Sequence, residues 1–169
     1  IERRRTKEPD GLAVEHPWVG AKSRPAVEGL TGDVIEKSSA VKRFVRELLT
    51  YSNDETLNAV YTADPEGYFA AIEKHKKADC DVSNGYGTNL RSAGKIKARM
   101  VAGHYIKMKD ADGAAVMHSG SRHAWNETWD PVSKQWVRFD DTPPKDPTLD
   151  EERPDEKSED DAGPGDYDE

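Results

Sequence analysis

Three residues whose side chains can together perform thiol chemistry occur in order along the chain: Cys80, His123 and Asp140. Cys80 is the only cysteine, so an intramolecular disulfide is excluded. It is a small buried apolar residue, a metal ligand or a reactive thiol. A nucleophilic cysteine needs a general base, and that base needs an orienting group. The sequence therefore predicts Cys80 as nucleophile, His123 as base and Asp140 as orienting carboxylate.

A predicted hairpin would bring the last two of these residues together. Residues 122–129 and 135–140 alternate as two antiparallel strands. In one register His123 lies directly opposite Asp140, and after a slip of two residues it lies diagonally across from it. These neighbours are about 5 and 7 Å apart, respectively. Both registers place the imidazole and the carboxylate on one face, whereas a slip of one residue would separate them.

Residues around this pair carry two further expectations. The slipped register places Glu127 opposite Arg138, which predicts a cross-strand ion pair. Asp141 competes with Asp140 for the orienting role, but the two side chains point to opposite faces of the strand. The alternation that starts at Trp136 favours Asp140.

The first half of the chain predicts three helices. The first is capped by Ser38 or Ser39 and carries one apolar stripe. A second begins at Asp64-Pro65. A third begins at Cys80, where the helix dipole and unpaired N–H groups would favour a thiolate. The apolar residues assigned to the stripe of the first helix are Val41, Phe44, Val45, Leu48 and Leu49, and those assigned to the third are Val82, Tyr86 and Leu90.

The second half predicts strands. A strand is expected from Arg99 to Met108, then a turn at 110–113 and a return strand over 114–117. Helices followed by antiparallel strands are typical of an α+β fold. We therefore expect N-terminal helices packed on an antiparallel sheet.

Charge divides the chain into a core and an acidic tail. Residues 146–169 hold 12 acidic and two basic residues, while the other 145 residues hold 21 acidic and 23 basic ones. The tail has almost no apolar side chains to bury, so we expect it to be disordered. The predicted division is an extended lead-in over 1–36, a core over 37–145 and the tail.

Several classes of function are disfavoured. The near-neutral core lacks the clustered basic face of a nucleic-acid-binding protein. No apolar stretch approaches the ~20 residues that span a bilayer. The histidines His104, His118 and His123 follow no zinc-ligand spacing, so neither a metal nor another cofactor is expected. Because the chain begins at Ile1, we expect it to be part of a longer polypeptide, of unknown compartment.

Four motifs in order, between about residues 38 and 144, resemble the transglutaminase-like core. They are a cysteine-led helix ending in Leu90-Arg91-Ser92-Ala93-Gly94, the strand Ala98-Arg99-Met100-Val101-Ala102-Gly103-His104-Tyr105, the stretch His123-Ala124-Trp125-Asn126-Glu127, and the segment Trp136-Val137-Arg138-Phe139-Asp140-Asp141-Thr142-Pro143-Pro144. No single motif is decisive, but this order and spacing are specific.

The resemblance implies a papain-like fold and a Cys80–His123–Asp140 triad acting on peptide or glutamine amides. A cysteine protease or amidase is favoured slightly over a cross-linking transglutaminase. Trp125 and Tyr51 are candidate substrate-binding residues, with core packing as the alternative for Trp125. One departure is Asp79, whose carboxylate beside the thiol is expected to oppose thiolate formation. The alternative function is a non-catalytic binding or scaffolding module with the same fold.

Overall fold

The helices precede the main sheet along the chain, as the sequence predicts. The structure, a computed structural model, describes residues 7–63, 67–104, 108–109, 111–113, 115–116 and 121–144. The helices of this part are α2 (Arg24–Glu28), α3 (Val34–Leu48), α4 (Glu55–Ala63), α5 (Tyr68–His75) and α6 (Cys80–Ala93). Its strands are β1 (Thr50–Tyr51), β2 (Lys77–Ala78), β3 (Ala98–His104), β4 (Met108–Lys109), β5 (Ala115–Val116), β6 (Arg122–Asp130) and β7 (Gln135–Phe139).

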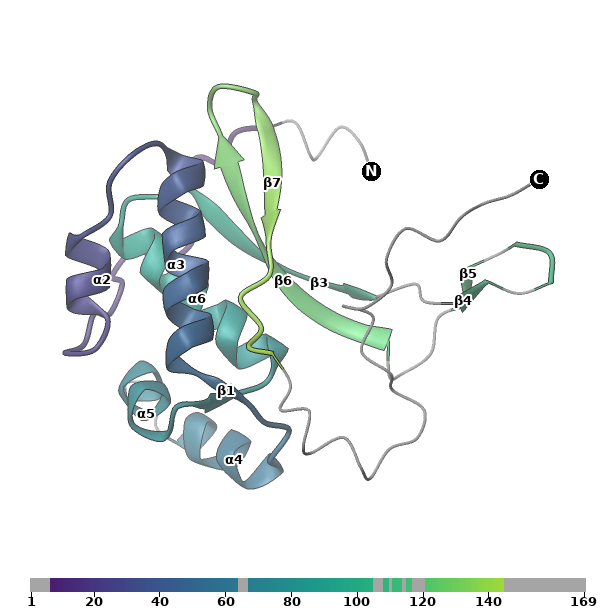
Figure 1. Ribbon diagram of the computed structural model, residues 1–169, viewed down its shortest axis with the longest axis horizontal. Helices are drawn as coiled ribbons and strands as arrows, with labels where there is room; N and C mark the ends of the chain where they lie inside the picture. Colours follow the sequence, from purple (N-terminus) through teal and green to yellow (C-terminus); the bar gives the residue numbers. More distant parts are fainter. Residues whose placement is uncertain are drawn as a thin grey trace.

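An antiparallel sheet with the order β3-β6-β7 packs against α3 and α6 (Figure 1). Along β6 the residues Ala124, Asn126 and Thr128 are fully buried. Thr128 hydrogen-bonds Ser38 of α3 at 2.8 Å, and Asn126 donates to the Asn84 carbonyl of α6 at 3.0 Å. This face of β6 therefore meets the helices. The α+β fold, with helices on an antiparallel sheet, is confirmed.

The hairpin of β6 and β7 adopts the slipped register. Glu127 pairs with Arg138, and Trp129 pairs with Trp136. The strands join through residues 131–134, and the Asp130 carboxylate accepts hydrogen bonds from two residues of this turn. The alternation of side chains along the two strands therefore places His123 and Asp140 on the same face of the hairpin, diagonally across from each other, as expected.

The strand predicted from Arg99 to Met108 is wrong at its C-terminal end. β3 ends at His104, and Met108 belongs to β4, which pairs with β5 in a separate hairpin. Gly113, with φ of 78°, lies in the turn between them. Positive φ is readily adopted by glycine, so Gly113 suits the turn between β4 and β5. The predicted turn and return strand are present, with β5 limited to Ala115–Val116.

The start of α3 differs from the predicted cap at Ser38 or Ser39. Asp33 is the N-cap, and its carboxylate accepts hydrogen bonds from the Ile35 and Glu36 N–H groups at 2.9 Å each. The Glu36 carboxylate accepts in turn from the Asp33 N–H, which completes a capping box. Ser38 instead lies inside the helix and is fully buried. The predicted apolar stripe is confirmed, since its members are all buried or partly buried.

The sequence does not predict the helices α2 and α4. α5 begins at Tyr68, with Gly67 as its N-cap. The predicted start at Asp64-Pro65 lies outside the described residues. The missed helices are only five and nine residues long, and isolated helices of this length gain their stability from tertiary packing.

The predicted lead-in is attached to the core. The Trp18 N–H donates to the Asn89 side chain at 2.9 Å, and the Asn89 amide donates back to the Trp18 carbonyl at 2.6 Å. The Trp18 ring stacks on Phe69 of α5, 6.4 Å between centroids. Trp18 therefore joins this segment to α5 and α6. The acidic tail lies outside the described residues, and the predicted domain boundaries remain predictions.

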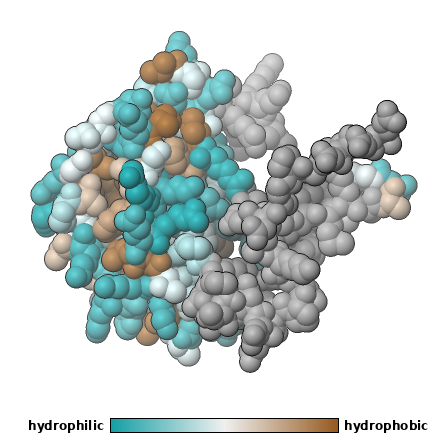
Figure 2. Space-filling view, viewed as in Figure 1, coloured by the Kyte–Doolittle hydropathy of each residue, from teal (hydrophilic) through white to brown (hydrophobic). Residues whose placement is uncertain are grey.

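The surface over the helices is mostly hydrophilic, with small separate hydrophobic patches in the view of Figure 2. None of the helices in the described part of the chain combines the length and apolar character needed to cross a bilayer.

Candidate active site

Cys80 is the first residue of α6, and the local sequence explains why the helix begins there. The Asp79 side chain accepts a hydrogen bond from the Val82 N–H at 2.9 Å, so Asp79 is the N-cap. Val82, Tyr86 and Leu90 are buried in the core and hold the helix in place, as predicted. The partly exposed thiol therefore lies at the positive end of a 14-residue helix. Asp79, the departure noted in the sequence, therefore has a structural role: its carboxylate caps the N-terminus of α6.

A short parallel pair of strands positions the residues before the cap. Thr50 of β1 pairs with Lys77 of β2, and Tyr51 pairs with Ala78. The Ser52 N–H also donates to the Ala78 carbonyl at 3.1 Å. This pairing places the backbone of Tyr51 beside the segment that leads into α6. The role of Tyr51 in substrate binding remains a prediction.

His123 and Asp140 meet through the hairpin. His123 Nε2 lies 2.6 Å from Asp140 Oδ2, and their side chains are 13% and 25% exposed. Interaction with the Cys80 side chain also raises the pKa of His123. With Nε2 engaged by Asp140, the other ring nitrogen, Nδ1, is the one left to meet the thiol. The structure thus brings the three predicted residues together from α6, β6 and the segment after β7.

The pKa values of His123 and Asp140 move in opposite directions. Burial alone would lower the pKa of His123, but hydrogen bonds and charge attraction to Asp140 and Cys80 raise it from 6.5 to about 9. Burial alone would raise the pKa of Asp140. Hydrogen bonds from His123 and Thr142 outweigh this and hold its pKa well below the usual range. At neutral pH the pair is therefore an imidazolium and a carboxylate.

This pair predicts a specific titration. We expect the His123 ring protons to titrate near pH 9 in an NMR experiment. Because the folded pKa is raised, the stabilising interaction is complete below about pH 6.5 and is lost as the pH rises through 9. Cys80→Ser and Asp140→Asn should each lower the midpoint, since each removes a side chain that raises the pKa of His123. A midpoint near 6.5 in the unmodified protein would contradict the geometry.

Asp141 has a different environment from its neighbour. It is fully buried and forms a two-pronged ion pair with Arg91 of α6, which is also fully buried. The Arg91 Nη1–Asp141 Oδ2 and Nη2–Oδ1 distances are 2.5 and 2.9 Å. The Asn126 amide donates to Asp141 Oδ2 as well. Of the two competing aspartates, Asp140 hydrogen-bonds His123, and Asp141 links the segment after β7 to α6 through its ion pair with Arg91.

Trp125 lies beside the histidine. Its ring stacks on His123, with centroids 6.3 Å apart and planes 23° apart, and Arg138 lies 4.6 Å from the Trp125 ring centroid. A Cβ added to Gly103 would lie 2.7 Å from the indole, so glycine leaves room for this ring on β3. Whether Trp125 also contacts substrate remains a prediction.

The predicted ion pair between Glu127 and Arg138 is wrong. The two residues face each other across the strands, but the Glu127 carboxylate pairs with Arg99 of β3, with N–O distances of 2.5 and 2.9 Å. Arg138 instead lies 3.8 Å from Asp140 Oδ2. The partner of Glu127 depends on β3 flanking β6, and the hairpin sequence does not contain that information.

The site includes two residues that the sequence patterns above do not predict, Asn84 and Thr142. Asn84 is fully buried in α6, and Thr142 donates to the Asp140 carboxylate. An asparagine inside a helix is unfavourable, and an aspartate two residues before a threonine is typical of a local turn. These two signals were present in the sequence.

No group of three histidine, cysteine, aspartate or glutamate residues could hold a metal ion among the residues that the structure describes. His104 hydrogen-bonds Ser121 at 3.0 Å, and His118 lies outside the described residues.

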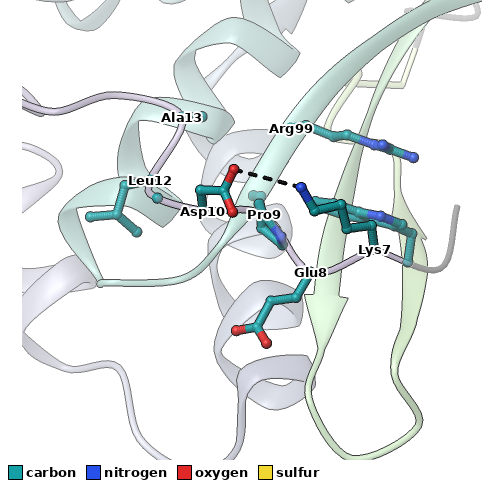
Figure 3. A pocket seen from close by; sticks show the side chains of 10 residues that line it. Lys7, Glu8, Pro9, Asp10, Leu12, Ala13 and Arg99 are labelled. Atoms are coloured by element: carbon teal, nitrogen blue, oxygen red, sulfur yellow. Dashed lines mark ion pairs between the residues drawn. The ribbon is translucent and has the colours of Figure 1, made fainter. Parts of the chain in front are cut away.

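A surface hollow of about 480 Å³ lies away from the Cys80–His123–Asp140 cluster, between the N-terminal segment and the sheet (Figure 3). Lys7, Asp10 and Arg99 lie along it, and Lys7 forms an ion pair with Asp10 at 3.8 Å.

Two solved structures share the fold. The periplasmic domain of TgpA from Pseudomonas aeruginosa aligns with a TM-score of 0.52 and 17% identity, covering 82% of this chain and 46% of that one. A protein from Cytophaga hutchinsonii, provisionally described as a cysteine protease, aligns with a TM-score of 0.50 and 17% identity, covering 71% and 36%. The chain thus spans less than half of each. At such identities the likeness concerns the fold alone.

None of the curated proteins matches the chain. The sequence model of the transglutaminase-like superfamily, in contrast, matches residues 21–141, which include α6, the sheet and the Cys80–His123–Asp140 cluster. The chain therefore belongs to the transglutaminase-like superfamily.

Proposed function

We propose that this protein is a thiol-dependent acyl-transfer enzyme. In this proposal Cys80 is the nucleophile, His123 is the general acid and base, and Asp140 orients the imidazole. The proposal depends on one observation: His123 Nε2 lies 2.6 Å from the Asp140 carboxylate, and Cys80 at the start of α6 acts with Asp140 to raise the pKa of His123. A nucleophile, base and orienting group linked in this order form the arrangement of enzymes that pass through covalent acyl intermediates.

The proposed reaction has two steps. The Cys80 thiolate attacks the carbonyl carbon of a peptide or glutamine amide, and the C–N bond breaks as His123 gives its proton to the departing amine or ammonia. The acyl group is left on Cys80 Sγ as a thioester, which is the acyl-enzyme. Neutral His123 takes a proton from water or a second amine, which attacks the thioester and releases the thiolate. The first N–H groups of α6 are suited to stabilise the oxyanion of each step.

The acceptor of the acyl group decides the product. Water gives a protease or amidase, whereas an amine gives a cross-link. We favour hydrolysis, because the thiol is partly exposed and water can therefore reach a thioester formed there. The description of the Cytophaga hutchinsonii protein as a cysteine protease agrees with this choice.

The test compares the unmodified protein with Cys80→Ala. We expect the unmodified protein to release ammonia or amine from a panel of glutamine peptides and peptide amides, and the variant to fold normally with no turnover. A labelled primary amine added to the same assay reports cross-linking by its incorporation. Release without incorporation supports a hydrolase.

Thiol reactivity provides the complementary measurement. An activated Cys80 should react with iodoacetamide well below pH 8.5, the ordinary titration point of a thiol. If Cys80 reacts only as an ordinary thiol and no substrate turns over, the proposal fails. The non-catalytic binding module would then be the better description.

A further inference from the structure

We propose that Thr142 and Asn84 are positioning residues that hold the Asp140 carboxylate in place for His123. This proposal rests on the proposed function, in which Asp140 orients the general base. Neither residue touches the reacting atoms in the proposed mechanism. Both act through the carboxylate that faces His123.

Thr142 engages one oxygen of the carboxylate. Its hydroxyl donates to Asp140 Oδ1 at 2.6 Å, and its backbone N–H donates to the same oxygen at 3.1 Å. His123 Nε2 meets the other oxygen, Oδ2, at 2.6 Å. With Oδ1 held at two points, rotation of the carboxylate is restricted and Oδ2 stays directed at the imidazole.

Asn84 binds the segments that carry all three residues of the proposed triad. Its Nδ2 lies 2.9 Å from the Cys80 carbonyl, 3.0 Å from the Ala124 carbonyl and 3.1 Å from Thr142 Oγ1. Asp140 Oδ1 is also within 3.5 Å of this nitrogen. Asn84 lies four residues, about one helical turn, after Cys80, so its side chain and the thiol follow the same helix face.

The orientation of the Asn84 amide follows from its neighbours. Oδ1 accepts from the Asp141 N–H at 3.0 Å and from the Asn126 amide at 3.2 Å. If the amide were flipped, its oxygen would face the Cys80 and Ala124 carbonyls, which cannot donate. The NH₂ group therefore faces Thr142, whose hydroxyl is left to donate to Asp140. Asn84 therefore meets Thr142, and Thr142 donates to the Asp140 carboxylate, which also accepts from the His123 ring.

Thr142→Val tests this order because it removes the hydroxyl and keeps the branched shape. We expect the NMR titration midpoint of His123 to fall, since Asp140 loses the donor that keeps its other oxygen directed at the imidazole. Alkylation of Cys80 at neutral pH should slow about tenfold, as for the loss of one charge-assisted hydrogen bond. Thr142→Ser keeps the hydroxyl and should restore both values toward those of the unmodified protein.

An unchanged His123 midpoint in Thr142→Val would overturn the proposal, whatever the effect on thermal stability. A purely structural role would lower the melting temperature without moving that midpoint. If the valine variant does not fold, Thr142→Ala repeats the measurement with a smaller side chain. The midpoint requires no turnover, so it tests the positioning role even if the peptide assays refute the proposed function.

Asn84→Ala combined with Thr142→Val tests the connection between the two residues. If Asn84 acts through Thr142, the double variant should show the same His123 midpoint as Thr142→Val alone. Two shifts that add would show that Asn84 acts by a separate route and would overturn its place in this order.

Discussion

Asp141→Asn is expected to lower the free energy of unfolding by about 3–5 kcal/mol, the usual cost of removing one partner of a buried ion pair. Asp141 and Arg91 are each fully buried and share two hydrogen bonds. Asparagine has almost the same shape, so the loss of charge is the main change. The Arg91 guanidinium would stay buried without its counter-charge. Chemical denaturation of the two proteins measures the difference.

Asp140→Asn is the matched control, because it makes the same substitution one residue earlier. The Asp140 side chain is 25% exposed and faces His123 rather than Arg91. We expect this variant to lose less stability than Asp141→Asn, because its pair with His123 is partly exposed, and to alkylate more slowly at Cys80. If Asp140→Asn is the more destabilising of the two, the division of roles between the aspartates is wrong.

The parts of the site that follow from local periodicity could be predicted from the sequence. The alternation of a strand fixes which face a residue occupies, so His123 and Asp140 could be assigned to one face without knowing the exact register. The four-residue spacing of Val82, Tyr86 and Leu90 identified the inner face of the helix that begins at Cys80. These features need only the neighbouring residues of one element.

The other parts depend on contacts between elements. The hairpin alone predicts Arg138 as the partner of Glu127, whereas Arg99 is its partner because β3 lies beside β6. The approach of α6 to β6 depends on buried amides, with Asn84 bonded to Asn126. A buried polar side chain takes its partners from wherever the tertiary structure provides them, so no periodic pattern encodes them.

The start of α3 is an intermediate case. The capping box of Asp33 and Glu36 is visible in the sequence, but two serines further along offered a competing cap. Ser38 proved to be needed inside the helix, where its hydroxyl meets Thr128 of the sheet. Tertiary packing decided between two local signals of similar strength.

Two glycines of α6 provide the second large prediction, because one has room for a side chain and the other has none. A Cβ at Gly87 would lie only 1.8 Å from Asp141 Oδ2 and 2.9 Å from Arg91 Nη1. Nothing lies within 4 Å of a Cβ at Gly85. The close approach at Gly87 lets the buried ion pair lie directly against the helix backbone.

Gly87→Ala should therefore destabilise the protein by about 1–3 kcal/mol or more, as overpacking does. It should also displace Asp141 and, through the adjoining peptide bond, Asp140, so Cys80 alkylation should slow. Gly85→Ala is the matched control and should raise the free energy of unfolding by about 0.5–1 kcal/mol, because alanine favours the helix over glycine. Denaturation and alkylation of both variants measure the contrast. Equal stability of the two variants would show that Asp141 is not packed tightly against the backbone of α6 at Gly87. The buried ion pair would then have no demonstrated effect on the position of Asp140.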